Sequence, residues 1–196
     1  MISRKSELSR KTAETEISIS LNLDGEGKYE INTGVGFFDH MLCLMTKHGL
    51  FDVNLSAKGD LYIDCHHTIE DIGIVIGQCI SKALGDKKGI KRYGTSFVPM
   101  DETLAMVSMD LSGRSYLVFD AEFTCEKIGE FDTEMVAEFF RAVAFNAGIT
   151  LHMEIVHGKN NHHMAEGLFK AFGRALCDAV QVDNRIKGIM STKGSI

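Results

Sequence analysis

Two nearly identical histidine-rich motifs constrain the fold of this chain more than any other feature. DCHHTIED occurs in the first half and NNHHMAEG near the C-terminus, and each sets two adjacent histidines ahead of a glutamate. His66 and His162, the first histidines of the two motifs, are 96 positions apart, while Gly49 and Gly148 are 99 apart. A nearly constant offset between matching features indicates an internal repeat.

Hydrophobic periodicity predicts the same order of elements in both halves. Alternating apolar residues indicate strands, and apolar residues three to four positions apart indicate helices. Gly85 is placed to end the first long helix, and Asp132 is predicted to cap a helix of the second half. The predicted strands are 17–24, 28–32, 51–57, 61–65, 97–111, 115–123 and 149–157, and the predicted helices begin at Gly36, at His66, after Asp132 and at His162.

These elements predict an α+β fold in which a unit of strand pair, helix, strand and helix occurs twice. The loop DKKGIKRYG joins the two units, and no linker-like composition separates them. We therefore expect a single pseudo-symmetric domain over residues 1–196, with repeat one at about 1–93 and repeat two at about 94–196.

Composition excludes several classes of protein. The formal net charge of −6 argues against nucleic acid as the main partner, because a phosphate backbone requires a basic surface. The longest apolar run, IGIVIG, is too short to cross a membrane, so no membrane association is expected. Five cysteines without a CxxC pair, and a polar N-terminal segment, predict a cytoplasmic protein with reduced thiols.

The spacing of the HHxxE motifs predicts metal binding. Residues i and i+4 share a helix face, whereas adjacent residues diverge by about 100°. His66 with Glu70, and His162 with Glu166, can therefore each hold one ion, and the remaining histidines point toward a second site. One such motif is more often a solvated helix end, but two copies at equivalent positions favour metal. Imidazole and carboxylate ligands without cysteine suit manganese, iron or zinc, and manganese is expected.

Further motifs occur in order along the chain and identify a family. They are RKTAET at 10–15, GFFDHML at 36–42, DCHHTIED at 64–71, RYG at 92–94, PMDE at 99–102, LSGR at 111–114, NNHHMAEGLFKAFGRAL at 160–176 and STKG at 191–194. Together they resemble imidazoleglycerol-phosphate dehydratase in its monofunctional form. The resemblance implies a fold in which each half pairs a four-stranded sheet with two helices, and an assembly of 24 identical subunits.

The resemblance also implies two Mn²⁺ ions per active site, with ligands contributed by neighbouring subunits. The implied ligands of one ion are His40, His67, His162 and Glu166. Those of the other are His66, Glu70 and His163, and its last ligand is Glu138, which stands where many relatives have a histidine. Alternatively, Glu138 is an ordinary surface residue, and a water molecule occupies this ligand position on the ion.

The implied reaction is the dehydration of imidazole glycerol phosphate to imidazole acetol phosphate in histidine biosynthesis. Metal ions on the ring nitrogens would stabilise an imidazolate whose electrons expel the hydroxyl. Glu14 is the expected base, and the metal ligands His40 and Glu166 are grouped with it as catalytic residues. The implied substrate contacts are Glu14 and, around the phosphate, Arg92, Arg114, Ser191 and Lys193.

Other interpretations stay open at the level of sequence. A metal-storage or sensor assembly would keep the HHxxE motifs but would have no use for the cationic residues. A metallohydrolase would instead use a metal-bound water. His152 is interpreted as a structural residue or one that supports a ligand, and Asp101 and Glu102 receive no role.

Overall fold

The computed structural model describes residues 4–194 and contains two four-stranded sheets. The first sheet has the order β1-β2-β4-β3 and the second β5-β6-β10-β7. The elements of the first half are β1 (Lys5–Lys11), β2 (Thr15–Asn22), β3 (Tyr29–Asn32), α1 (Gly36–Gly49), β4 (Asp52–Gly59) and α2 (His66–Leu84). Those of the second are β5 (Tyr93–Met100), β6 (Thr103–Asp110), β7 (Tyr116–Asp120), β8 (Lys127–Ile128), β9 (Phe131–Asp132), α3 (Met135–Ala147), β10 (Thr150–His157) and α4 (Asn161–Ala179).

The two sheets have the same connectivity, which confirms the predicted duplicated α+β fold. In each sheet the first strand pairs antiparallel with the second, and the second pairs antiparallel with the last. The third strand then joins the last in parallel at the edge. Only the small hairpin of β8 and β9 interrupts the correspondence among the described residues. The boundary near residue 93 stays a prediction, and β5 begins at that residue.

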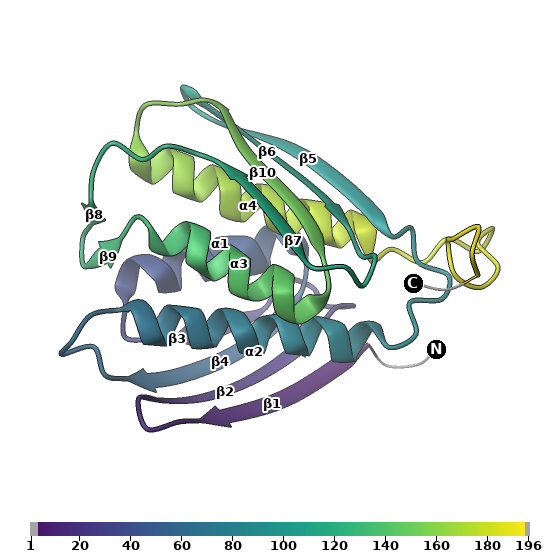
Figure 1. The fold of residues 1–196 in the computed structure, drawn as a ribbon, viewed down its shortest axis with the longest axis horizontal. Helices are drawn as coiled ribbons and strands as arrows, with labels where there is room; N and C mark the ends of the chain where they lie inside the picture. Colours follow the sequence, from purple (N-terminus) through teal and green to yellow (C-terminus); the bar gives the residue numbers. More distant parts are fainter. Residues whose placement is uncertain (1–3, 195–196) are drawn as a thin grey trace.

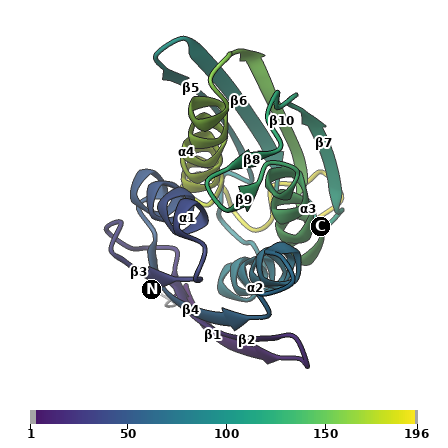
Figure 2. The ribbon, with the colours of Figure 1, turned by 90° about the vertical axis from the view of Figure 1, so that its left-hand side faces the viewer.

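The four helices lie between the two sheets (Figures 1 and 2). The helices of one half pack against those of the other, α1 against α4 and α2 against α3. Fully buried phenylalanines fill the space between them. Their ring centroids lie about 5 Å apart, as in the contacts Phe38–Phe139 (5.1 Å), Phe139–Phe169 (5.4 Å) and Phe140–Phe172 (5.1 Å). Burial of these large apolar surfaces stabilises the fold and joins the halves.

Glycines on one face of α2 let α3 approach closely. A Cβ added at Gly73 would lie 2.8 Å from the carbonyl oxygen of Phe139 and from Cβ of Ala142. At Gly77 it would lie 2.7 Å from the carbonyl oxygen of Val143. Both distances are shorter than van der Waals contact, so only glycine fits at these positions of the helix pair.

Three local predictions are wrong. Residues 61–65 form turns before α2 rather than a strand. The predicted strand 97–111 is two strands, β5 and β6, separated by a turn at Asp101 and Glu102. Asp132 does not cap α3: it lies in β9 and makes an ion pair with Lys127, and the helix begins three residues later, at Met135, without a side-chain cap.

In addition, β1 has no counterpart among the predicted strands. The sequence of β1 shows no apolar alternation because two of its three less exposed positions, Ser6 and Arg10, are polar and only Leu8 is apolar.

The arrangement of the elements gives the molecule two distinct ends (Figure 1). The N-termini of α2 and α4 lie at one end, and the segment that follows α4 lies at the other. We call the first the histidine end, because it carries His66, His67, His162 and His163. Within residues 4–194, no helix combines the length and apolar character needed to cross a membrane.

Replacing Gly73 with alanine should destabilise the protein. Alanine favours a helix over glycine by about 1 kcal/mol, but the added methyl group meets a backbone carbonyl that cannot move freely. We expect Gly73→Ala to lower the free energy of unfolding by about 1–3 kcal/mol, the usual effect of overpacking. Urea denaturation measures the change. Gly36→Ala is the matched control, because a Cβ there meets nothing within 4 Å, and equal losses in both variants would contradict the close-packing argument.

Candidate active site

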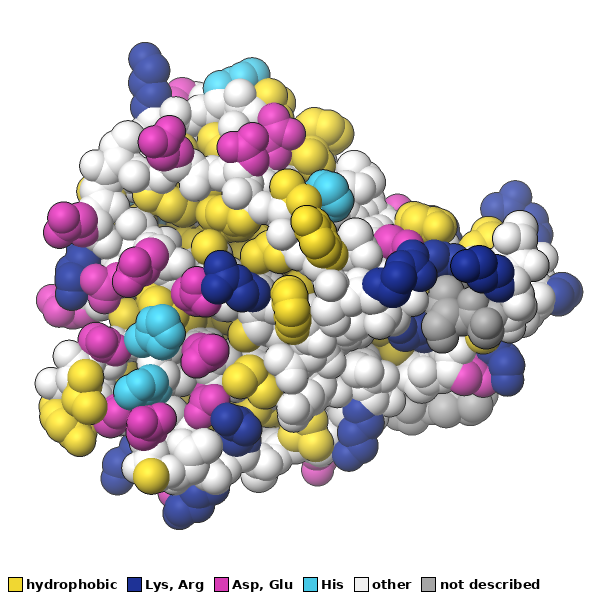
Figure 3. Space-filling view, in the orientation of Figure 1, with side chains coloured by type: hydrophobic (Ala, Val, Ile, Leu, Met, Phe, Trp, Pro, Cys, Tyr) yellow, Lys and Arg dark blue, Asp and Glu magenta, His cyan; other side chains and the backbone are white. Residues whose placement is uncertain are grey.

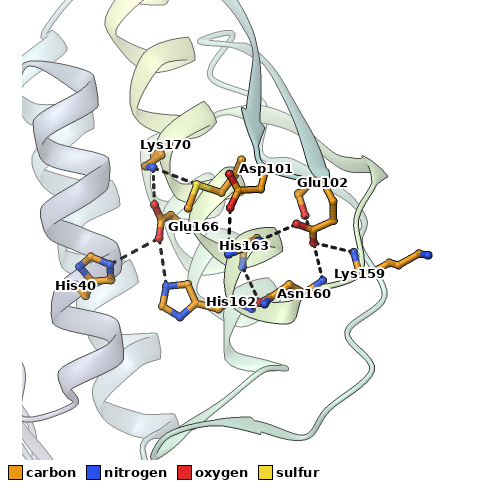
Figure 4. Close-up of polar contacts among 11 residues, drawn as sticks. His40, Asp101, Glu102, Lys159, Asn160, His162, His163, Glu166 and Lys170 are labelled. Carbon is orange, nitrogen blue, oxygen red and sulfur yellow. Dashed lines mark hydrogen bonds and ion pairs between the residues drawn. The ribbon is translucent and has the colours of Figure 1, made fainter.

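The first site at the histidine end is built by α1 and α4 (Figure 4). Oε2 of Glu166 lies 3.2 Å from Nε2 of His162 and 3.7 Å from Nε2 of His40. One potential ligand atom from each residue lies within 4.8 Å of the other two. The first and second halves therefore contribute to one cluster, and the contact between His162 and Glu166 confirms the predicted shared helix face.

Glu166 is held charged in a buried position. Its exposed fraction is 6%, and Nζ of Lys170, one turn further along α4, makes an ion pair with its second oxygen. Burial acts to raise the pKa of Glu166, but the hydrogen bond and charge of Lys170 outweigh it, and the pKa lies below the ordinary 4.5. Lys170 was missed in the sequence, although its i+4 spacing from Glu166 was a readable signal.

A second cluster joins His67 to two carboxylates of the first half. Nδ1 of His67 lies 2.9 Å from Oδ2 of Asp60, which follows β4, and Nε2 lies 3.9 Å from Oε1 of Glu14 in the turn between β1 and β2. The hydrogen bond with Asp60 is the main cause that raises the pKa of His67. Glu14, the expected base, therefore does lie at the histidine end, and it is about half exposed.

His163 has similar surroundings in the second half (Figure 4). Its Nδ1 lies 2.8 Å from Oε2 of Glu102, and its Nε2 lies 3.9 Å from Oδ2 of Asp101. The hydrogen bond with His163, followed by those from the backbone N–H groups of Asn160 and Lys159, lowers the pKa of Glu102 to about 2. The same bond raises the pKa of His163.

The other expected ligands are not brought together within one protomer. The rings of His66 and His67 diverge, with centroids 6.2 Å apart and planes at 78°. Glu138 lies on α3 and makes an ion pair with Arg141 at 2.9 Å. Within residues 4–194, the clusters of three potential ligand atoms include neither His66, Glu70 nor Glu138.

The residues of the first cluster fit a divalent metal ion. The imidazoles of His40 and His162 converge on the buried carboxylate of Glu166, and imidazole with carboxylate is a ligand set of manganese, iron and zinc. Three of the four expected ligands of one ion are thus preassembled, and His67 lies in the other cluster.

A basic pocket lies at the opposite end of the molecule. This open cavity of about 1230 Å³ is bordered by Arg92, Arg114, Ser191 and Lys193, so four expected phosphate contacts do share one cavity. Its other cationic neighbours are Lys91, Arg185 and Lys187. The space-filling view shows Lys and Arg side chains gathered at this end, and His with Asp and Glu at the other (Figure 3).

Arg92 and Arg114 differ in how far they are engaged. Arg92 is buried, contacts both oxygens of Asp110 at 2.6 and 2.9 Å, and donates to the carbonyl oxygen of Met190 at 2.6 Å. It therefore fixes the C-terminal segment that borders the pocket, and it retains two of its five N–H donors for a ligand. Arg114 is 70% exposed and lies 3.6 Å from Asp110, so it is the freer cation.

His152 lies apart from these groups. It is exposed on β10, between the buried residues Leu151 and Met153, so its side chain stands on the face of the second sheet that does not meet the helices. It belongs to neither cluster of potential ligands among the described residues.

Fold and site together define a duplicated α+β protein with histidine–carboxylate clusters at one end and a basic pocket at the other. The profile of the family described as Imidazoleglycerol-phosphate dehydratase matches residues 33–176. An imidazoleglycerol-phosphate dehydratase of Clostridium acetobutylicum is 71% identical over 189 residues, 96% of each chain. One of Acetivibrio thermocellus is 66% identical, over 98% of this chain and 99% of that one.

Solved structures agree. The crystal structure of the Staphylococcus aureus N315 dehydratase has a TM-score of 0.83 and 48% identity, over 91% of this chain and 99% of the other. The Pyrococcus furiosus protein, solved with the compound (S)-C348, has a TM-score of 0.83 and 33% identity, over 96% and 100%. The chain belongs to the imidazoleglycerol-phosphate dehydratase family and is an enzyme of that class, a dehydratase of histidine biosynthesis. The resemblance seen in the motifs is thereby confirmed.

Removing the charge partner of Glu166 should destabilise the metal-free protein in a pH-dependent way. Lys170→Met leaves a buried carboxylate with one fewer charged partner, and we expect a loss of about 1–3 kcal/mol at pH 7. Because the folded pKa of Glu166 lies below its ordinary 4.5, the stabilisation is present above pH 4.5 and is lost as the pH falls through the folded value. The difference in the free energy of unfolding between the variant and the parent should therefore become smaller at low pH.

Urea denaturation at pH 7 and at low pH, in the presence of chelator, measures this effect. Lys28→Met is the control, because Lys28 pairs with Glu26 at 2.7 Å on the open surface and should matter little at either pH. If Lys170→Met loses the same free energy of unfolding at both pH values, the packing of the Lys170 side chain, rather than its charge, stabilises the protein.

Proposed function

We propose that this enzyme removes water from imidazole glycerol phosphate to give imidazole acetol phosphate, with two Mn²⁺ ions in each active site. The observation that carries the proposal is the pairing of histidine–carboxylate clusters with a separate basic pocket. The clusters suit metal ions and an imidazole ring, and the pocket suits a phosphate group.

The proposed ligands follow the two expected sets. His40, His67, His162 and Glu166 hold one ion, and His66, Glu70, Glu138 and His163 hold the other. When bound, the ions would supply positive charge beside the imidazole ring of the substrate, which would favour departure of the neighbouring hydroxyl.

Glu14 is the proposed base. The substrate carbon that must lose a proton is next to the one that loses the hydroxyl, and its hydrogen is not acidic by itself. A carboxylate close to the ring can take that proton. Glu14 is half exposed in a hairpin turn and 3.9 Å from His67, so it is both accessible and close to a proposed ligand.

One protomer does not bring the two halves of the site together. The clusters lie at the N-termini of α2 and α4, and the basic pocket is bordered by residues that follow the C-terminus of α4. A helix of 19 residues is about 28 Å long, several times the length of a three-carbon chain. We propose that the ring and the phosphate of one substrate are bound by different copies of the chain, within an assembly of 24 subunits.

The basic pocket favours a dehydratase over the two rival functions. A storage or sensor protein needs ligands for metal but no cluster of arginine and lysine. A metallohydrolase would use a metal-bound water to add water to its substrate, whereas the family to which this chain belongs is one of dehydratases. Incubating the purified protein with Mn²⁺ and imidazole glycerol phosphate tests the proposal, since acetol product should form and chelator should stop it. Metal binding without product, or hydrolysis of the phosphate, would reject it.

Arg114→Ala should weaken substrate binding without removing metal. A charge-assisted hydrogen bond to phosphate contributes about 1.5–3 kcal/mol, so KM should rise about tenfold or more. Steady-state kinetics give KM, and elemental analysis gives the metal content, which should equal that of the parent. An equal loss toward an analogue without the phosphate would contradict this role.

Two inactive variants should restore activity when they assemble together. His162→Ala removes a ligand from the histidine end, and Arg114→Glu reverses a charge in the basic pocket. If each site takes these residues from different copies, co-expression leaves up to about a quarter of the sites intact. Activity of the separately tagged, co-purified mixture is the measurement, with each variant alone as the control. A mixture as inactive as its components would mean that one copy supplies both ends.

Glu138 is expected to bind metal in place of histidine. It would have to leave Arg141, its present partner at 2.9 Å. Glu138→Ala should lower the affinity for one of two Mn²⁺ ions, and Glu138→His should keep both ions while moving metal preference toward zinc or copper. Manganese titration measures both effects. Two ions bound by Glu138→Ala as tightly as by the parent would show that water fills this position.

A further inference from the structure

Two carboxylates that the proposed reaction does not use stand behind the two outward-pointing histidines. Asp60 contacts Nδ1 of His67 at 2.9 Å, and Glu102 contacts Nδ1 of His163 at 2.8 Å. In both cases Nε2 points the other way, with its nearest acidic oxygen 3.9 Å distant. The same geometry therefore occurs twice, once in each half of the duplicated fold.

A carboxylate beside Nδ1 decides which ring nitrogen carries the proton. An ionised carboxylate can only accept a hydrogen bond, so Nδ1 must donate, and Nε2 is left with the free electron pair that a metal needs. The pair of contacts also fixes the rotation of each ring. His67 and His163 are in this way prepared as Nε2 ligands.

Both carboxylates are themselves held in place. Asp60 is only 8% exposed, and its other oxygen is buried without a hydrogen-bond partner within residues 4–194. Glu102 accepts through Oε1 from the backbone N–H of Asn160 at 2.8 Å and of Lys159 at 3.3 Å (Figure 4). Neither is a freely rotating surface side chain.

The two carboxylates reach equivalent histidines from non-equivalent places. Asp60 follows Gly59, the last residue of β4. The matching residue of the second half follows Gly158, just after β10, and is Lys159, which has no side-chain acceptor. In the second half, Glu102 supplies the acceptor from the turn between β5 and β6. A carboxylate thus contacts Nδ1 of the equivalent histidine in both halves, although it comes from a different segment in each. This recurrence indicates that the contact has a function.

We propose that Asp60 and Glu102 are positioning residues, each of which orients one histidine so that its Nε2 binds one of the two Mn²⁺ ions. The inference rests on the ligand sets of the proposed function, in which His67 and His163 serve different ions. It assigns Asp60 to one ion and Glu102 to the other.

Manganese titration of single variants tests the assignment. Asp60→Asn and Glu102→Gln keep the size of the side chain and remove its charge, and the EPR signal of free Mn²⁺ reports how many ions bind and how tightly. We expect each variant to lose about 10–100-fold in affinity for one ion and to bind the other like the parent. The double variant should have a lower affinity for both ions.

Asp52→Asn is the matched control. Asp52 also accepts two backbone N–H groups, from Glu26 at 2.8 Å and Lys28 at 3.0 Å, but its hydrogen bonds within residues 4–194 involve no histidine. It should bind both ions like the parent. A comparable loss of affinity in this control would assign the effect to loop stability and overturn the inference.

A second measurement does not depend on metal. Solid-state ¹⁵N NMR of the metal-free protein labelled in histidine counts rings protonated at Nδ1, and each variant should lose one such ring from the parent count. The inference would be overturned if the variants kept the parent's tautomers and its affinities for Mn²⁺. It would also be overturned if a single variant lowered the affinity for both ions equally. If the parent itself binds no manganese, the proposed function fails, and the NMR result alone then decides the orienting role.

Discussion

The packing of helices across the two halves is the constraint on which the rest of the structure depends. Each half has one sheet that buries a single face, so its helices must find a second apolar surface, and the helices of the other half provide it. The buried phenylalanines from α1, α3 and α4 meet in this layer. Because α1 lies against α4, His40 of the first half reaches Glu166 of the second. The cluster is thus a consequence of the core.

The same packing explains the polarity of the molecule. Helices α2 and α4 begin at the same end, so both HHxxE motifs and both acidic hairpin turns gather there. The cationic residues of the pocket come from the segment that follows the last helix and from the segments before β5 and β7, and they collect at the far end. There Arg92 fixes the C-terminal segment through the carbonyl of Met190. Charge separation of this kind is consistent with the proposed reaction, in which different copies of the chain bind the ring and the phosphate of one substrate.

Carboxylates act in two ways around the histidines. Glu166 is a potential ligand, kept charged by Lys170 despite its burial. Asp60 and Glu102 contact the far nitrogen of a histidine and are placed to orient it. The distinction follows from which imidazole nitrogen each carboxylate touches.

The sequence by itself determined the duplication, the helical faces and the family, since these depend on spacing along one chain: His162 and Glu166 share a face because they are one helical turn apart. Through the family motifs it also identified four residues that border the basic pocket, namely Arg92, Arg114, Ser191 and Lys193. Only the tertiary structure decided which residues of different elements meet: Asp60 lies beside His67, Glu102 beside His163, and His40 beside Glu166. It likewise separated Arg92, already bound to Asp110, from the exposed Arg114. Local errors had the same origin: residues 61–65 have the composition of a strand, but no neighbouring strand is present for them to pair with among residues 4–194.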